Sequence, residues 1–235
     1  MLDWQPVPEK LVLSDGTLDI WRFSLTQPSF KIQELAQLLC PEEQHRAERF
    51  YFQKDRLCFI ACRGMLRKIL GAYLEVEPSQ LQFSYRKRGK PYLKGEQIHF
   101  NLSHSQNLAL YAVTKNFSVG VDVEGFNQTK PVEQIAQRFF SPREQDVMNR
   151  LLPREKRQAF FRAWTRKEAY LKATGEGLGG GLEQVEVSLL PEEPANLINI
   201  PGWFLEDIQL GENYFGAVAA GGEVVRVNYW QAVEL

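Results

Sequence analysis

The chain has 235 residues, which is enough for one large domain or two small ones around a buried core. Hydrophobic residues make up 44% of it and charged residues 24%, as in an ordinary soluble globular protein. The net charge is −1, so the total charge gives no reason to expect binding to nucleic acid or to an anionic membrane. The first residues lack a basic segment followed by an apolar one, and no apolar run reaches the length of a membrane span. We therefore expect a cytoplasmic protein.

The chain contains three cysteines, Cys40, Cys58 and Cys62. Cys58 and Cys62 are four residues apart on a predicted helix, with no histidine close to them in the sequence, and this spacing gives little support for a zinc site. In a cytoplasmic protein we expect three reduced, partly buried thiols.

The N-terminal part of the chain predicts a strand at residues 18–25, a helix beginning at Pro41 and a second helix over about residues 54–73. A proline at the first helical position followed by acidic residues is typical of a helix start. Residues 80–85 predict another strand, which leads into the basic turn Arg86-Lys-Arg-Gly-Lys-Pro91. Such a run is usually a solvated loop. Its glycine and proline, however, fix a tight turn that can direct several cations at one anion.

Three further strands, at residues 98–102, 108–114 and 118–124, have short connections and predict an antiparallel meander. In the third strand, alternation places its valines on one face and Asp122 and Glu124 on the other. Two like charges about 4 Å apart repel by about 4 kcal/mol at an effective dielectric constant of 20. The two carboxylates are therefore expected either to face water or to share a cation.

The C-terminal part predicts helices at residues 131–139 and after Ser141, then strands at residues 185–190, 203–210, 214–220 and 224–230. The segments 175–181 and 191–201 are expected to be loops. Several residues recur at a spacing of 101, which suggests two similar halves, each a layer of helices followed by strands. The recurring residues are Pro41, Glu43, Gln44, Arg49 and Phe59, matched by Pro142, Glu144, Gln145, Arg150 and Phe160.

The segment around residues 160–174 predicts an amphipathic helix with an acid in its apolar stripe. Phe161, Trp164 and Leu171 fall on one arc of this helix, and Glu168 lies within the same arc with Lys172 one turn later. A buried carboxylate is costly unless a cation or a donor meets it, so Glu168 indicates a site. The alternative is an exposed Glu–Lys pair that contributes only a few tenths of a kcal/mol.

Together these segments supply three acids, Asp122, Glu124 and Glu168, beside one lysine. Ligands made of oxygen alone favour a hard cation such as Mg²⁺ or Mn²⁺. Because Mg²⁺ usually completes its shell with water and substrate phosphates, the pattern implies a substrate that carries phosphate. A different phosphotransferase or nucleotide hydrolase is less favoured, because the sequence has no Gly-x-x-x-x-Gly-Lys-[Ser/Thr] phosphate loop.

The segment Gly120-Val-Asp-Val-Glu124, followed by Trp164-Thr-Arg-Lys-Glu-Ala-Tyr-Leu-Lys172, resembles the motif pair of the 4′-phosphopantetheinyl transferases. The resemblance extends to Arg88-Gly-Lys-Pro91, Asn101-Leu-Ser-His-Ser105 and Arg138-Phe-Phe-Ser-Pro-Arg-Glu144. The length and the two-halved layout resemble the monomeric Sfp-type branch. The resemblance implies an α+β fold of two similar subdomains related by pseudo-two-fold symmetry, each a small antiparallel sheet packed with helices. The subdomains are expected at residues 1–118 and 119–235, with the active site at their interface.

The implied reaction transfers 4′-phosphopantetheine from coenzyme A to a serine of an apo acyl or peptidyl carrier protein and releases 3′,5′-ADP. By resemblance, Asp122, Glu124 and Glu168 hold Mg²⁺, with Mn²⁺ as the other candidate. Glu168 is also the expected general base, and the catalytic set is completed by Asp122 and by Lys172, which neutralises charge on the diphosphate. The alternative is a non-catalytic module of the same fold that only binds carrier proteins.

The nucleotide end of coenzyme A is expected to contact the basic turn and the strand that ends near His104. Arg46 is a further candidate, whereas Glu43 stands where the family often has a basic residue. The residues that the resemblance assigns to coenzyme A binding are Arg63, Arg86, Arg88, Lys90, Ser103, His104 and Lys172.

Overall fold

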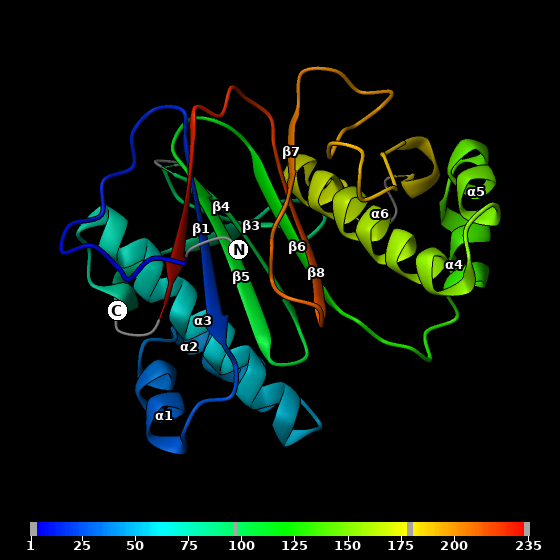
Figure 1. Ribbon diagram of the computed structural model, residues 1–235. Coiled ribbons are helices and arrows are strands. Elements are labelled where there is room, and N and C mark those ends of the chain that lie inside the picture. Colours follow the sequence, from blue (N-terminus) through cyan, green and yellow to red (C-terminus); the bar gives the residue numbers. More distant parts are fainter. Residues whose placement is uncertain (1–3, 96–97, 178–180, 233–235) are drawn as a thin grey trace.

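Two long helices of equal length, α3 (Gln53–Leu74) and α6 (Pro153–Thr174), each pack against a β-sheet (Figure 1). A computed structural model of the chain describes residues 4–95, 98–177 and 181–232. Within these residues no helix is both long enough and apolar enough to cross a bilayer. The mixture of helices with small, mostly antiparallel sheets confirms the predicted α+β class.

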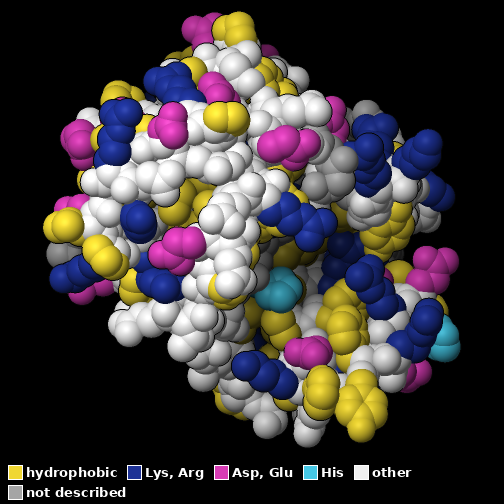
Figure 2. Space-filling view, turned by 90° about the vertical axis from the view of Figure 1, so that its right-hand side faces the viewer, with side chains coloured by type: hydrophobic (Ala, Val, Ile, Leu, Met, Phe, Trp, Pro, Cys, Tyr) yellow, Lys and Arg dark blue, Asp and Glu magenta, His cyan; other side chains and the backbone are white. Residues whose placement is uncertain are grey.

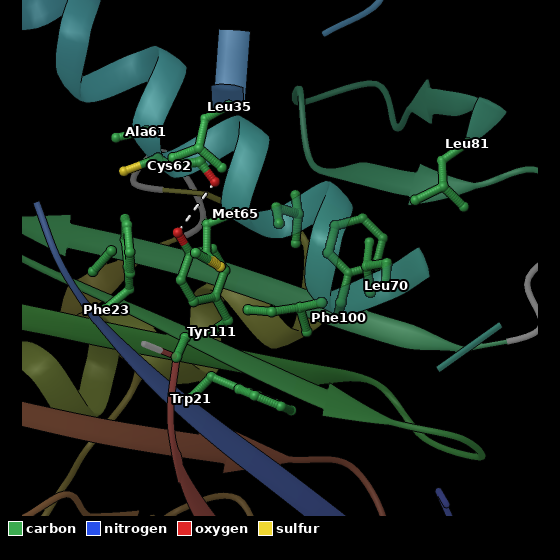
Figure 3. Close-up of a cluster of buried hydrophobic side chains, with 14 of the residues drawn as sticks. Trp21, Phe23, Leu35, Ala61, Cys62, Met65, Leu70, Leu81, Phe100 and Tyr111 are labelled. Carbon is green, nitrogen blue, oxygen red and sulfur yellow. Dashed lines mark hydrogen bonds between the residues drawn. The ribbon is translucent and has the colours of Figure 1, made fainter. Parts of the chain in front are cut away.

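The N-terminal helices cover a four-stranded sheet. Its order is β4 (His99–Ser105), β5 (Leu108–Thr114), β1 (Thr17–Ser24) and β9 (Arg226–Gln231), and β1 and β9 form its one parallel pair. Trp21, Phe23 and Tyr111 of the strands pack beneath α3, as Figure 3 shows. The Tyr111 hydroxyl donates a hydrogen bond of 3.1 Å to the carbonyl of Cys62 and so fixes α3 against β5.

Short elements complete this half of the molecule. The helix α1 (Ser29–Gln37) packs against α3, and α2 (Pro41–Glu48) lies between α1 and α3 in the sequence. A short 3₁₀ turn, η1 (Pro78–Gln80), leads to a hairpin of β2 (Phe83–Tyr85) and β3 (Pro91–Leu93) that closes around the basic turn. Gly89 in this turn has φ 85°, a conformation that glycine adopts without strain.

The C-terminal half consists of α6 on a three-stranded antiparallel sheet. The order of this sheet is β6 (Val119–Gly125), β8 (Tyr214–Ala220) and β7 (Phe204–Asp207). The helices α4 (Val132–Phe139) and α5 (Pro142–Asn149) pack beside α6, and a 3₁₀ turn, η3 (Leu182–Gln184), follows it (Figure 1). The last strand, β9, returns to the N-terminal sheet, so the N-terminal half contains residues from both ends of the chain. The boundary between residues 118 and 119 stays a prediction.

Side chains of β4 join the two sheets. The side-chain oxygens of Asn101, Ser103 and Ser105 accept hydrogen bonds from the backbone N–H groups of Val121, Val123 and Gly125, at 2.9, 3.4 and 3.0 Å. The predicted meander is therefore correct for β4 and β5 but wrong for the third strand, since β6 pairs with β8 instead of β5.

The predicted internal repeat has a structural counterpart at the start of each half. Glu43 and Glu144 are both the third residue of a short helix, and each carboxylate accepts from the backbone N–H of the residue before that helix. Each carboxylate is also buried against a cation of the following long helix, Arg67 for Glu43 and Lys167 for Glu144. Both cations lie 14 residues after the first residue of their helix. The same ion pair therefore ties the short helix to the long one in both halves.

Several predicted elements differ from the structure. The helix α1 and the strand β3 were not predicted, and the predicted strand at residues 185–190 is wrong, because only an isolated bridge between Val187 and Leu197 forms there. The Val187 N–H donates instead to the Glu144 side chain at 2.9 Å, so this backbone completes the buried ion pair. Of the predicted loop at 175–181, residues 178–180 lie outside the described residues.

Candidate active site

The motif acids of β6 meet α6 because these two elements approach very closely at Gly120. A Cβ atom on Gly120 would lie 2.1 Å from the Ala169 carbonyl oxygen and 2.3 Å from the Ala173 nitrogen. Only glycine, which has no Cβ, permits this approach. Asp122 is two residues further along the strand and lies opposite Glu168 and Lys172 on the helix. The close contact at Gly120 therefore brings the acidic motif of β6 next to the Glu–Lys motif of α6.

One oxygen of Asp122 is fully engaged. Its Oδ1 lies 2.6 Å from the Lys172 Nζ and accepts the Ser103 hydroxyl at 2.8 Å. Lys172 also donates to the Ser103 Oγ at 2.8 Å. Ser103, predicted to contact the nucleotide, thus lies beside the acids and holds Asp122 and Lys172 in place.

Two other carboxylate oxygens are buried without a partner among the described residues, Asp122 Oδ2 and Glu168 Oε1. The two side chains belong to residues that are only 4% and 7% exposed. A buried carboxylate oxygen without a hydrogen bond is costly, and native structures retain few of them. These two oxygens therefore provide a place where a cation or a hydrogen-bond donor would be strongly favoured.

Burial also makes Glu168 a weaker acid than an exposed glutamate. Burial, assisted by the negative charge of Asp122, raises the pKa of Glu168 to about 7, while Lys172 opposes the rise. Burial likewise raises the pKa of Glu124, against the attraction of Lys130. A carboxylate with a pKa near neutrality is suited to accept a proton at physiological pH.

Lys130 is a site residue that the sequence reasoning missed. Its Nζ lies 3.6 Å from Glu124 and 5.4 Å from the ring centres of both Phe161 and Trp164. The lysine follows β6 in an irregular segment, and no spacing or periodicity singles it out. In the sequence, the one feature that could have drawn attention to Lys130 is its position before Pro131, shortly after the acidic strand.

The three acids were predicted to share one divalent cation. Within the described parts of the chain, one group of three potential ligand atoms lies within 4.8 Å of one another, and it consists of Cys58, Cys62 and His104 instead of the acids. The orphaned oxygens of Asp122 and Glu168 nevertheless fit a hard ion, because Mg²⁺ is usually held by one or two carboxylates with phosphate and water completing its shell. The ligand set of Asp122, Glu124 and Glu168 stays a prediction.

A cleft of about 420 Å³ lies beside α3 and contains His104, Arg46 and Arg63 in its lining. Figure 2 shows a hollowed face on which a histidine lies among lysine, arginine and hydrophobic side chains. The His104 Nδ1 is 3.7 Å from the Cys58 Sγ. Hydrogen bonds from Cys62 and His104 lower the pKa of Cys58 to about 5, and the hydrogen bond with Cys58 raises that of His104.

Arg63 is buried in the wall of this cleft. Its Nε donates to Glu43, its second guanidinium nitrogen donates to the Tyr85 hydroxyl at 2.9 Å, and its guanidinium lies 4.0 Å from the ring centre of Phe83. Glu43 therefore forms buried ion pairs with both Arg63 and Arg67.

The remaining predicted nucleotide-binding residues lie elsewhere. Arg86 and Lys90 line a second cleft of about 390 Å³. Lys90 donates to the carbonyls of Val119 and Ala173 at 3.0 and 2.9 Å, which ties the basic turn to β6 and α6. Burial lowers the pKa of Lys90 to about 8. Arg88 donates to the carbonyl of Glu176. The structure thus brings His104 and Arg63 to one cleft and Arg86 and Lys90 to another.

Comparison with known families agrees with the motifs and the fold. Residues 118–224 match the model of the 4′-phosphopantetheinyl transferase superfamily, and residues 24–116 match that of the 4′-phosphopantetheinyl transferase N-terminal region. The chain belongs to the 4′-phosphopantetheinyl transferase superfamily and is a transferase enzyme, as the motif pair predicted.

Individual relatives extend this match over the whole chain. The chain is 45% identical over 232 residues to the 4′-phosphopantetheinyl transferase HetI of Nostoc sp., covering 97% of both chains. It is 34% identical over 171 residues to the transferase psf-1 of Bacillus pumilus, covering 71% of each. Against the transferase Sfp of Bacillus subtilis it is 29% identical over 153 residues, covering 64% of this chain and 66% of the relative. The two-halved, Sfp-type branch is thereby confirmed.

Proposed function

We propose that the site between β6 and α6 transfers the 4′-phosphopantetheine group of coenzyme A to a serine of a carrier protein and releases 3′,5′-ADP. The family membership makes the chain a 4′-phosphopantetheinyl transferase. The observation that carries the assignment to this site is the pair of orphaned oxygens, Asp122 Oδ2 and Glu168 Oε1, beside Lys172.

Asp122, Glu168 and Glu124 are the residues that would hold Mg²⁺ or Mn²⁺. When bound, such an ion supplies positive charge to the diphosphate of coenzyme A and to the leaving phosphate. The protein fixes the direction of these ligands, since Ser103 and Lys172 immobilise Asp122, and the packing of Gly120 against α6 sets the distance between strand and helix.

In the reaction, the serine oxygen forms a new bond to the β-phosphorus of coenzyme A and the bond from that phosphorus to the bridging oxygen breaks. The serine proton passes, directly or through a water, to Glu168, the carboxylate that the family resemblance assigns as the base. The electron pair of the broken bond remains on 3′,5′-ADP. Lys172, which is already within the site, stabilises this developing negative charge.

The cleft beside α3 is suited to the nucleotide end of coenzyme A. Arg46, Arg63 and His104 contribute polar groups to it, and Phe59 and Leu102 contribute apolar surface. This combination fits a phosphorylated nucleoside, in which an apolar base and a charged phosphate must both be accommodated. Lys90, Arg86 and Arg88 support this assignment less directly, because they line or border the neighbouring cleft.

The proposed partners are acyl and peptidyl carrier proteins, whose acidic surface would meet a basic and apolar surface between the two halves. We also propose that the chain acts as a monomer in the cytoplasm.

Calorimetry with coenzyme A, in the presence and absence of Mg²⁺, separates this function from that of a non-catalytic module. The proposed enzyme shows heat of binding that depends on the metal. A module that only docks carrier proteins shows no such heat and leaves an apo-carrier protein unmodified in the presence of coenzyme A and Mg²⁺.

A further inference from the structure

Outside the acidic site, the structure brings together three metal-binding side chains that the transfer reaction does not use as a group. Cys58 and Cys62 lie one turn apart on α3, and His104 reaches them from β4. Their ligand atoms, two sulfurs and one ring nitrogen, all lie within 4.8 Å of one another. No histidine lies close to these two cysteines in the sequence, and the fold supplies one 42 residues beyond Cys62.

The distance between two of these atoms is close to that between ligands of a tetrahedral ion. With Zn–S bonds of about 2.3 Å and Zn–N bonds of about 2.0 Å, a thiolate and an imidazole on the same tetrahedral zinc lie about 3.5 Å apart. The Cys58 Sγ and the His104 Nδ1 are 3.7 Å apart. Little movement is therefore needed for these two side chains to share a metal ion.

The surroundings favour a fixed site with one open side. Cys62 is buried, and its carbonyl is held by the Tyr111 hydroxyl, which keeps this turn of α3 in place (Figure 3). Cys58 is half-buried, whereas His104 is exposed toward the cleft. An ion bound by the three side chains would thus face the cleft with its remaining coordination position.

We propose that Cys58, Cys62 and His104 form a binding site for Zn²⁺ or a similar thiolate-preferring divalent ion, with a fourth position open to the cleft. Two metal–sulfur bonds and one metal–nitrogen bond form, and the protons of the two thiols pass to the solvent. Water occupies the fourth position, as at zinc sites that have three protein ligands. The site is distinct from the acidic one, whose oxygen ligands select hard ions.

The position of this site gives it a consequence for substrate binding, which rests on the proposed function. His104 lines the cleft assigned to the nucleotide end of coenzyme A. A metal ion and its water at the cleft wall would occupy space that the nucleotide needs. Zinc is therefore expected to weaken the binding of coenzyme A.

Titration of the full chain with Co²⁺, in buffer with a phosphine reductant and without coenzyme A, tests the site directly. The intact chain binds one equivalent of Co²⁺ with a thiolate-to-metal absorption band and the strong visible bands of tetrahedral Co²⁺, and Zn²⁺ displaces them. Cys58→Ser, a change of a half-buried residue, removes the thiolate band, and Cys62→Ala does the same. Cys40→Ser is the matched control and keeps the full spectrum, because Cys40 lies outside the group.

A Cys58→Ser variant that retains the wild-type melting temperature and also retains the complete Co²⁺ spectrum would overturn the site. A wild-type chain without a thiolate band would do so equally.

The consequence is tested separately by calorimetry with coenzyme A before and after one equivalent of Zn²⁺. Zinc is expected to lower the affinity for coenzyme A about tenfold in the wild-type chain, which is within the usual range of coupling between sites, and to leave that of Cys58→Ser unchanged. Equal affinities with and without zinc would overturn the competition. If coenzyme A fails to bind under all conditions, the proposed function fails, while the Co²⁺ spectrum still decides the metal site.

Discussion

Replacing Glu168 with glutamine should stabilise the protein at alkaline pH while removing its activity. In the folded protein, burial raises the pKa of Glu168 from its ordinary value of 4.5 to about 7. The folded state therefore holds a proton between these two pH values that the unfolded chain has already lost. By linkage, the free energy of unfolding of the wild-type protein falls as the pH rises through this window.

The size of the effect follows from the two pKa values. At 1.36 kcal/mol per pKa unit, the rise from 4.5 to about 7 corresponds to about 3 kcal/mol. Glutamine is uncharged at every pH and resembles the protonated acid in shape. The variant should therefore match the wild type near pH 4.5 and exceed its stability by about 1–3 kcal/mol at pH 8, since relaxation of the site reduces the full value.

The assay is urea denaturation of both proteins at pH 5 and pH 8, without divalent ions. The expected result is a difference in the free energy of unfolding that appears at pH 8 and is much smaller at pH 5. Asp146→Asn, which changes an exposed acid on α5, is the control and should show no such pH dependence. A Glu168→Gln variant whose stability relative to wild type is the same at both pH values would refute the reasoning that Glu168 is a desolvated acid.

Three further predictions concern the surroundings of the site. Gly120→Ala forces a Cβ atom into the backbone of α6 and should lower the free energy of unfolding by about 1–3 kcal/mol, measured by thermal unfolding. Transfer activity should be lost as well. An unchanged melting temperature would contradict the close approach of β6 to α6. Glu43→Gln leaves Arg63 and Arg67 without their buried acid and should cost about 3–5 kcal/mol in denaturant titrations, whereas a loss below 1 kcal/mol would show that the pair is not strongly coupled to the fold. Lys130→Met removes a cation that lowers the pKa of Glu168, so the pKa of Glu168 should rise. The acidic limb of the pH profile of kcat/KM should therefore move to higher pH. An unmoved limb would show that Lys130 does not act on Glu168.

Much of the candidate site could be predicted from the sequence because its geometry depends on regular elements. Alternation along β6 correctly separates Asp122 from the valines that fill the space between the sheets. Helical periodicity correctly places Glu168 and Lys172 on one side of α6. The sequence does not explain why a glycine opens the acidic motif. Only the structure shows how closely the strand approaches the helix at Gly120.

The features of the site that could not be predicted from the sequence depend on contacts between distant segments. The cluster of Cys58, Cys62 and His104 forms because β4 lies against α3, and no local spacing encodes that approach. The basic turn offers four cations in six residues, yet Lys90 is used to bind two backbone carbonyls. Charge alone therefore could not distinguish a cation that faces the cleft from one that holds the two halves together.

The pairing of β6 with β8 was missed for a related reason. Short connections favour neighbouring strands, but here serine and asparagine side chains of β4 bond to the backbone of β6 and take the place of a strand-to-strand ladder. Side-chain bonds of this kind leave no periodic signal in the sequence.

The most direct test of the central claim measures the loading of an apo-carrier protein by intact mass, with coenzyme A and Mg²⁺. The wild-type chain should convert the carrier protein to its phosphopantetheinylated form, and Asp146→Asn should do so equally. Asp122→Ala, with its fold verified by circular dichroism, should leave the carrier protein unmodified because the acid paired with Lys172 is gone. Full loading by Asp122→Ala would contradict the assignment of the transfer reaction to the acids of β6 and α6.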